Sequence, residues 1–260
     1  MTITDTHIHL YSEDYDQDRE ELIENAFQQK VKRFFLPAID SQTTRAMYNL
    51  QAKYPENVFL MMGLHPTHVR DNSESGGYEE ELAHVARQFE KKKFYAVGEI
   101  GIDLYWDKST LKIQQEAFSW QIKLAKKHKL PIVIHCRAAF DEVFEVLEEE
   151  KDENLFGIFH CFTGNLAQAK QALSYNLKLG IGGVVTFKNG KIDKFLNEIP
   201  LGHIVLETDG PYLSPAPYRG KRNKPEYVVK VAEKLAEIYG KTLSEIAEIT
   251  TQNSKDIFKI

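Results

Sequence analysis

Six side chains of the kinds that bind metal ions follow short apolar segments in this chain. Because alternate side chains of a strand point to one face, two histidines in an HxH pattern are expected to lie together, roughly 6.5–7 Å apart. A single metal ion can bridge that separation, whereas on a helix the same pair would diverge by roughly 200°. A lone buried histidine is usually a core residue, but several ligands at separate strand ends favour a metal site. The six are His7, His9, Glu99, His135, His160 and Asp209.

Six ligands exceed what one tetrahedral ion needs, so the set indicates two divalent ions. Glu99 is expected to bridge them with its two carboxylate oxygens. His7 and His9 are then expected on one ion, and His135 and His160 on the other. Two ions held in this way activate a water for attack on phosphorus or carbon. The ligand types suit Mg, Mn or Zn without selecting one of them.

Acidic residues near the ligands have expected roles of their own. Asp209 is the expected general base, which takes the proton from the attacking water while it also binds metal. Glu207 and Asp5 each lie two residues before a ligand, on the same face but deeper. Charges pointing inward there are costly without partners, so both are expected to orient the ligands from behind.

Strands and helices alternate along the whole chain, which predicts parallel strands with right-handed crossovers. Eight such units favour a closed (β/α)8 TIM-type barrel, a single domain over residues 1–260, with its active site at the C-terminal ends of the strands. A doubly wound open sheet is the alternative, but it would place ligands at one switch point. The predicted strands are Ile3–His9, Arg33–Ile39, Phe59–His65, Phe94–Asp103, Pro131–Cys136, Phe156–Cys161, Leu177–Gly183 and Ile204–Asp209. The predicted helices are Glu20–Lys30, Gln42–Tyr54, Tyr78–Lys92, Leu111–Lys129, Phe140–Lys151, Leu166–Tyr175, Asp193–Ile199, Glu226–Tyr239 and Leu243–Phe258.

The overall charge and composition exclude some classes of partner. The net charge of −5 gives no global attraction to nucleic acid or anionic lipid, so an anionic substrate must be held by local charge or metal. The N-terminal segment lacks the features of a signal peptide, and no apolar run is long enough to cross a membrane. A cytoplasmic location is therefore expected, with no obligate protein partner. Cys136 and Cys161 each follow a ligand histidine, so they are expected to be buried free thiols on the outer face of their strands.

The chain contains DTHIHL near its start and ETDGPYLSP at 207–215. With the other motifs given below, they resemble the TatD-type family of metal-dependent deoxyribonucleases, among the amidohydrolase-like metal-dependent hydrolases. The resemblance implies a (β/α)8 barrel, the six ligands above for two metals, and active-site positions at His65 and Arg137. The family usually carries Asp or Asn where this chain has Tyr11, and often an acidic residue at Ala138. Neither departure is expected to touch a ligand. The other motifs are GLHP at 63–66, GEIGID at 98–103, PIVIHCR at 131–137, HCFTG at 160–164 and RGKRNKP at 219–225.

Loops at the predicted catalytic face combine cations with aromatic rings. Such a combination is typical of a platform for phosphates and unstacked bases, although a solvated run of charges is the simpler interpretation. The cations are Arg219, Lys221, Arg222 and Lys224, and the aromatics are Tyr105, Trp106, Tyr212 and Tyr218. The expected substrate contacts are His65, Arg137, Tyr105, Arg219 and Lys221.

Three functions are compatible with these features. The first is a nuclease that cleaves the phosphodiester bonds of DNA, at ends or in single strands. The second is a hydrolase of a small ester, lactone or amide; many such barrels bridge their metals with a carbamylated lysine on strand four, and no lysine lies between Phe94 and Asp103. The third is a binding scaffold that has lost catalysis, which would be expected to have a broken ligand set.

Overall fold

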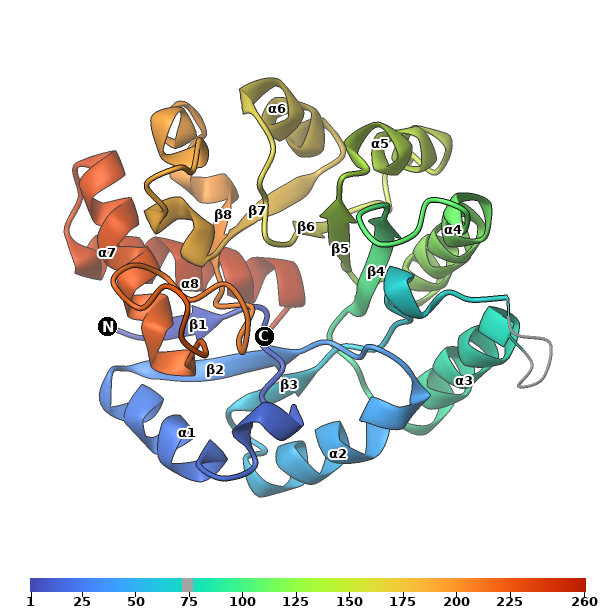
Figure 1. Cartoon of the computed structure of the whole chain (residues 1–260), viewed down its shortest axis with the longest axis horizontal. Coiled ribbons are helices and arrows are strands. Elements are labelled where there is room, and N and C mark those ends of the chain that lie inside the picture. The colour runs from blue at the N-terminus through green and yellow to red at the C-terminus, as the bar shows by residue number, and fades with distance from the viewer. Residues whose placement is uncertain (72–76) are drawn as a thin grey trace.

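The computed structural model describes residues 1–71 and 77–260, and it arranges eight parallel strands in a ring with helices outside (Figure 1). The strands pair in chain order, β1 to β3 in one sheet and β4 to β8 in the other. Their bounds are β1 Ile3–Asp5, β2 Val31–Leu36, β3 Val58–Leu60, β4 Val97–Asp103, β5 Ile132–Arg137, β6 Gly157–Phe159, β7 Leu177–Ile181 and β8 Ile204–Leu206.

Two seams of backbone hydrogen bonds join these sheets into a closed barrel. Between β3 and β4, the Met62 N–H donates to the Ala96 carbonyl at 3.2 Å, and the Gly98 N–H donates to the Met62 carbonyl at 3.1 Å. Between β8 and β1, the Thr6 N–H donates to the Leu206 carbonyl at 2.9 Å. No free edge remains at either seam, so the predicted (β/α)8 barrel is confirmed and the open sheet is excluded.

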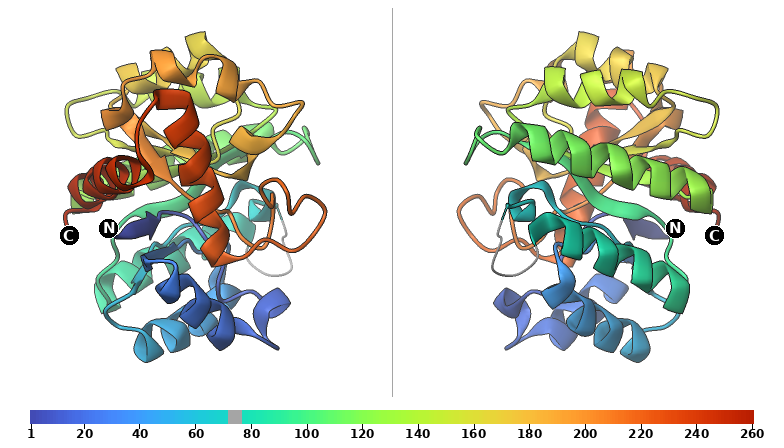
Figure 2. Two further views of the ribbon diagram at one scale, coloured as in Figure 1. Left: turned by 90° about the vertical axis from the view of Figure 1, so that its left-hand side faces the viewer. Right: turned by 90° about the vertical axis from the view of Figure 1, so that its right-hand side faces the viewer.

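Eight helices cover the outside of the barrel, and α8 packs against both β1 and β8. The long loop between β8 and α7, drawn in orange, projects from one end of the barrel (Figure 2). Among the described residues, no helix has the length and the apolar character needed to cross a bilayer. The helices are α1 Arg19–Gln28, α2 Thr44–Lys53, α3 Gly77–Lys91, α4 Leu111–His128, α5 Phe140–Glu149, α6 Leu166–Ser174, α7 Val228–Tyr239 and α8 Leu243–Phe258.

The barrel interior is apolar at its base and polar at its C-terminal end. Phe258 at the end of α8 stacks on Phe35 of β2, with ring centroids 3.7 Å apart, so α8 closes the base. Val133 and Ile158 belong to the same buried cluster. Because strand side chains alternate, the residues two positions further along, His135 and His160, point to the same interior above this apolar floor. The same strands therefore position the apolar residues at the base of the barrel and the histidines above them.

Several predicted element bounds differ from the structure. Most strands end earlier than predicted, since the ladder stops at Asp5 in β1 and at Leu206 in β8. Beyond those points the backbone keeps single hydrogen bonds to its neighbours, such as that from the Ile8 N–H to the Phe35 carbonyl at 3.1 Å, but it lies outside the strands. The predicted helix Asp193–Ile199 is wrong, because two 3-10 helices, Ile192–Lys194 and Leu196–Glu198, lie there instead. A stretch this short is costly to nucleate as an α-helix.

Candidate metal centre

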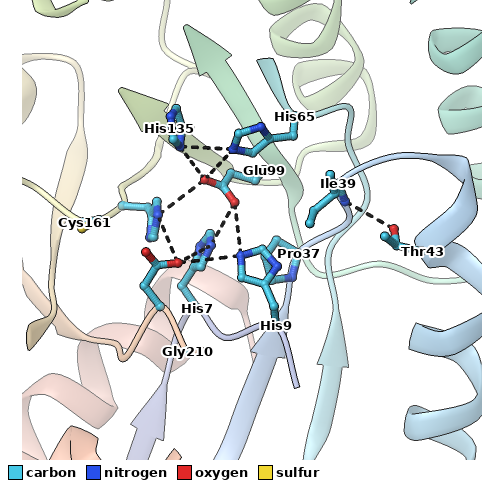
Figure 3. A network of polar contacts seen from close by, with 12 residues as sticks. His7, His9, Pro37, Ile39, Thr43, His65, Glu99, His135, Cys161 and Gly210 are labelled. Atoms are coloured by element: carbon cyan, nitrogen blue, oxygen red, sulfur yellow. Dashed lines mark hydrogen bonds and ion pairs between the residues drawn. The ribbon is translucent and has the colours of Figure 1, made fainter. Parts of the chain in front are cut away.

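The carboxylate of Glu99, on β4, lies at the centre of a buried group of histidines (Figure 3). Its Oε2 atom faces the HxH pair, 3.0 Å from His7 Nε2 and 3.7 Å from His9 Nε2. Both histidines lie beyond the end of β1, not on the strand as predicted. Their rings nevertheless converge, with centroids 5.2 Å apart.

The other oxygen of Glu99 faces a second group of histidines. Its Oε1 atom lies 2.8 Å from His135 Nδ1 and 3.4 Å from His160 Nε2. His65, which follows β3, lies as close to this oxygen as His160 does, with its Nε2 at 3.4 Å. The same nitrogen lies 3.2 Å from His135 Nδ1. One carboxylate thus separates two sets of imidazole nitrogens, which is the arrangement expected of a bridging ligand.

Asp209, just beyond β8, completes the first group. Its Oδ1 atom lies 3.8 Å from His7 Nε2, 3.7 Å from His9 Nε2 and 3.9 Å from His160 Nε2. The residue has φ 58, a left-handed conformation that Asp tolerates better than most residues. The backbone places it, because its N–H donates to the His7 carbonyl at 2.9 Å.

Carboxylates behind the histidines orient two of the rings. His135 Nε2 lies 2.9 Å from Asp103 Oδ2, and His160 Nδ1 lies 3.0 Å from Glu207 Oε1. Glu207 also accepts from the Cys161 N–H at 2.6 Å. A Cβ on Gly180 would come within 2.3 Å of the Glu207 carboxylate, so glycine is needed there. Each ring presents its other nitrogen to Glu99, as metal-binding histidines do.

Asp5 joins the ends of β1 and β8 beneath the site. Its Oδ1 accepts from the His7 N–H at 3.2 Å and from the Thr208 N–H at 3.0 Å. Its Oδ2 accepts from the Thr208 hydroxyl at 2.6 Å. Asp5 therefore holds the backbones next to His7 and Asp209, in line with the orienting role expected of it.

The protonation states of three residues suit metal ligation. Burial lowers the pKa of His7, and lowers the pKa of His9 to about 4, so both imidazoles are neutral near pH 7. Burial acts to raise the pKa of Glu99, but the surrounding histidines outweigh it and hold that pKa well below its usual value. Neutral imidazoles and an ionised carboxylate are the forms that bind metal.

Two of the other three candidate ligands, His160 and Asp209, show that the centre attracts positive charge. Burial acts to lower the pKa of His160, but the carboxylates of Glu207, Glu99 and Asp209 raise it to about 10. Burial raises the pKa of Asp209 to about 7, against the effect of His160. Without a bound cation, the buried carboxylates thus favour protons. Divalent ions would supply that charge directly.

The donor set fits two divalent ions, as the sequence predicts. Groups of candidate ligand atoms within 4.8 Å of one another include His7, His9 and Glu99 in one place, and His65, Glu99 and His135 in another. The Nδ1 atom of His7 is buried without a hydrogen-bond partner. Nitrogen and carboxylate ligands suit Zn or Mn. Number and identity of the ions remain predictions.

A cavity of about 630 Å³ opens from these ligands to the surface. Arg137 is the one lysine or arginine among its described lining residues. Its guanidinium lies over the Tyr105 ring, 3.7 Å from the centroid, and 5.5 Å from the centroid of Trp106. Trp106 and Tyr212 line the cavity too, and their side chains are 72% and 54% exposed. The mouth of the site is therefore aromatic and carries one strong cation.

Three of the predicted substrate contacts, Tyr105, Arg219 and Lys221, do not line this cavity. Arg219 and Lys221 are exposed on the loop after β8, and neither lines the cavity. The Arg219 guanidinium stacks on Phe187, 3.6 Å from its ring centroid. A neighbouring cation of the same loop, Arg222, pairs with Asp18. Two cations of the predicted phosphate-binding platform, Arg219 and Arg222, therefore contact other residues of the chain and help to fix the loop.

The prediction for the two cysteines is wrong in part. Both are free, but they are half-buried and border the cavity rather than lying wholly in the outer layer. Cys161 follows β6 with φ 42, so strand alternation no longer sets its direction. Cys136 also packs against the outer hydrophobic core. Burial raises the pKa of both thiols, to about 12 for Cys136, which keeps them protonated at neutral pH.

Sequence reasoning missed two residues that hold ligands. Asp103 contacts His135, and the Tyr11 hydroxyl lies 2.9 Å from His9 Nδ1. The signal for Asp103 is present in the sequence, since it lies four residues after Glu99 on the same strand and so on the same face. Tyr11 has no such signal, because it lies outside any strand.

The protein has a barrel of parallel strands, with histidines and carboxylates gathered in a pocket at its C-terminal end. This combination is typical of the metal-dependent hydrolases built on the same fold. A family profile described as TatD related DNase matches residues 4–259. The chain belongs to this family, and it is a metal-dependent hydrolase.

Relatives and a solved structure agree with this assignment. The chain is 45% identical over 258 residues to YabD of Bacillus subtilis, named an uncharacterized metal-dependent hydrolase, with 98% of each chain covered. It is 31% identical to YcfH of Escherichia coli, which has the same description, with 100% of this chain and 97% of the relative covered. The crystal structure of YjjV, a TatD homologue from Escherichia coli, superposes with a TM-score of 0.91 at 29% identity, covering 99% of this chain and 98% of that one.

Proposed function

We propose that the protein hydrolyses phosphodiester bonds of DNA, at ends or in single strands. The observation that carries this proposal is the position of Glu99, with one carboxylate oxygen toward His7 and His9 and the other toward His135 and His160. Two divalent ions, when bound, would act as Lewis acids and lower the pKa of the attacking water.

The chain's own residues would position the substrate and move the proton. Asp209 is the proposed general base, because its Oδ1 faces both groups of histidines and so lies beside the position of the attacking water. Arg137 is the proposed partner of the scissile phosphate, since it is the cation of the cavity. His65 is proposed to contact the same phosphate, because it lines the cavity beside Glu99.

The aromatic mouth supports nucleic acid as the substrate. Unstacked bases bind aromatic side chains with little dependence on sequence, and Trp106 and Tyr212 present exposed rings beside the cavity. At a net charge of −5, attraction to DNA must come from such local contacts. Arg219 and Lys221 would then meet only flanking phosphates, beyond the cavity.

The size of the cavity supports ends and single strands over intact duplex. A volume of about 630 Å³ is in the range of small-molecule sites. A duplex is too wide to enter it without opening, whereas a terminal or unpaired nucleotide needs no such opening. Hydrolysis of a small ester, lactone or amide is the alternative function, and it requires no aromatic mouth.

Two tryptophans of the chain allow a matched test of this proposal. Trp106 lines the cavity, whereas Trp120 is exposed on α4, outside it. Trp106→Ala is expected to raise KM for a single-stranded oligonucleotide by about 5- to 100-fold, because it removes one base-stacking contact. Trp120→Ala is expected to leave that KM unchanged. Steady-state kinetics on the oligonucleotide and on bis(p-nitrophenyl) phosphate, which has no bases, would measure both effects.

The second substrate separates the possible outcomes. An unchanged rate on bis(p-nitrophenyl) phosphate in Trp106→Ala would support base stacking at this residue. Equal losses on both substrates would show that Trp106 shapes the site instead. Fast hydrolysis of small esters by the wild-type enzyme, with no cleavage of oligonucleotides, would favour the alternative function.

A further inference from the structure

Tyr11 is one of the two residues at which this chain departs from the TatD-type pattern, and, contrary to the expectation from sequence, it contacts a proposed ligand. The phenol is buried, with 8% of the residue exposed. Its hydroxyl donates to the Pro37 carbonyl at 2.7 Å. The same oxygen lies 2.9 Å from His9 Nδ1. One buried hydroxyl thus joins the HxH segment to the segment that follows β2.

The single proton of the phenol decides which nitrogen of His9 carries hydrogen. A carbonyl oxygen can only accept, so the phenol proton lies toward Pro37. The Tyr11 oxygen must then accept from His9, which places the hydrogen of the neutral ring on Nδ1. The lone pair of His9 is left on Nε2, the atom that faces Glu99 Oε2 and Asp209 Oδ1 at 3.7 Å each. Tyr11 therefore selects the tautomer that can bind a metal ion.

The ring of Tyr11 also limits how His9 can turn. It meets His9 edge-on, with centroids 5.7 Å apart and planes at 80°. Tyr212 meets the imidazole in a similar way, at 6.1 Å and 69°. His9 is thus held between two aromatic rings, and only Tyr11 also hydrogen-bonds it among the contacts found in the described residues.

The other ligand histidines are held differently. His135 Nε2 is hydrogen-bonded to the carboxylate of Asp103, whereas His160 Nδ1 lies 3.0 Å from the Glu207 carboxylate without the geometry of a hydrogen bond. The second nitrogen of His7 has no hydrogen-bond partner among the described residues. In the first group of ligands, the one side chain that fixes a histidine through its second nitrogen is therefore a neutral phenol. Such partners commonly change metal affinity.

We propose that Tyr11 is a positioning residue that fixes the tautomer and the ring plane of His9. Through His9 it sets the affinity of the ion held by His7, His9, Glu99 and Asp209. This inference rests on the metal centre of the proposed function, but it does not depend on DNA as the substrate.

Tyr11→Phe tests this proposal because it removes only the hydroxyl. The dissociation constants of both ions are measured by titrating chelated protein with Mn²⁺ or Zn²⁺ against an indicator chelator. Loss of a hydrogen-bond partner behind a metal ligand commonly weakens binding by about 10- to 100-fold. We expect that loss for one of the two ions and no change for the other. With metal in excess, kcat is expected to recover more than half of its wild-type value.

Tyr239→Phe is the matched control. Tyr239 ends α7, and its hydroxyl shares its single proton between the carbonyls of Leu196 and Ile199, at 2.6 and 2.8 Å. It lines no part of the metal cavity. Its loss is expected to lower the melting temperature without changing either dissociation constant. A merely structural Tyr11 would behave in the same way, and that result would overturn the proposal.

A second measurement needs no variant and covers the case in which Tyr11→Phe does not fold. Nitrogen-15 NMR of the metal-free wild-type protein, labelled at histidine, reports the tautomer of each ring. His9 is expected to carry its hydrogen on Nδ1, and hydrogen on Nε2 would contradict the proposal. A wild-type protein that binds no ion would overturn both the proposal and the metal centre. A protein that binds two ions but does not cleave DNA would count against the proposed substrate alone.

Discussion

Glu99→Gln is expected to remove bound metal and activity together. The amide has one oxygen where the carboxylate has two, so it can serve His7 and His9 or His135 and His160, but not both groups. The amide nitrogen would donate a hydrogen bond to an imidazole nitrogen whose lone pair would otherwise bind a metal ion. Metal activation is worth several kcal/mol, and about 1.4 kcal/mol corresponds to tenfold in rate. A loss of at least about 10³-fold in kcat/KM follows.

Elemental analysis and steady-state kinetics on the same preparation would check this result. Glu90→Gln is the control, because Glu90 is exposed in the last turn of α3 and does not line the metal cavity. It is expected to keep wild-type metal content and rate. If Glu99→Gln retained two ions per chain together with full activity, Glu99 would not be the bridge.

Asp209→Asn is expected to have opposite effects on activity and on stability. An amide cannot take the proton from the attacking water, and loss of a general base costs about 10²- to 10⁴-fold in rate. In the metal-free protein, however, burial raises the pKa of the Asp209 carboxyl to about 7, against the effect of His160. Folding then disfavours the charged carboxylate, and Asn carries no such charge. The metal-free variant is expected to be more stable than the metal-free wild type at pH 8.

The dependence on pH follows from the sign of this shift. The unfolded chain has an ordinary Asp pKa, about 3.9, whereas the folded value is about 7. The folded state therefore holds the extra proton between these values, and wild-type stability falls as pH rises through that range. The gain in the free energy of unfolding from Asp209→Asn should be small near pH 4 and largest at pH 8. Urea unfolding in the presence of chelator measures it, and an advantage that does not grow with pH would refute this assignment.

The order of strands and the convergence of the six candidate ligands could be predicted from sequence because both depend on local patterns. Apolar segments with a period of two indicate strands, and a ligand at the end of each converges only in a barrel. Val133 and Ile158 illustrate the point, since each lies two residues before a ligand and points to the same interior. Strand ends were less predictable, because the ladder stops wherever the backbone turns to line the site.

Contacts between segments far apart in the sequence were beyond prediction. The hydrogen bond from Tyr11 to Pro37 depends on how the loop after β1 meets the end of β2. The direction of Cys161 depends on a left-handed backbone that no motif signals. Stacking of Arg219 on Phe187 holds that cation outside the cavity, which its place in a basic motif does not signal. Each case arises from tertiary packing rather than from periodicity.

The most direct test of the central claim is to count ions while measuring DNA cleavage. Wild-type protein is stripped with chelator, and Mn²⁺ is added back in steps while hydrolysis of a single-stranded oligonucleotide is followed. We expect no cleavage in the stripped protein and full activity when two ions are bound per chain. Cleavage that survives chelation, or that reaches its maximum with one ion bound, would contradict a centre in which Glu99 bridges two metals.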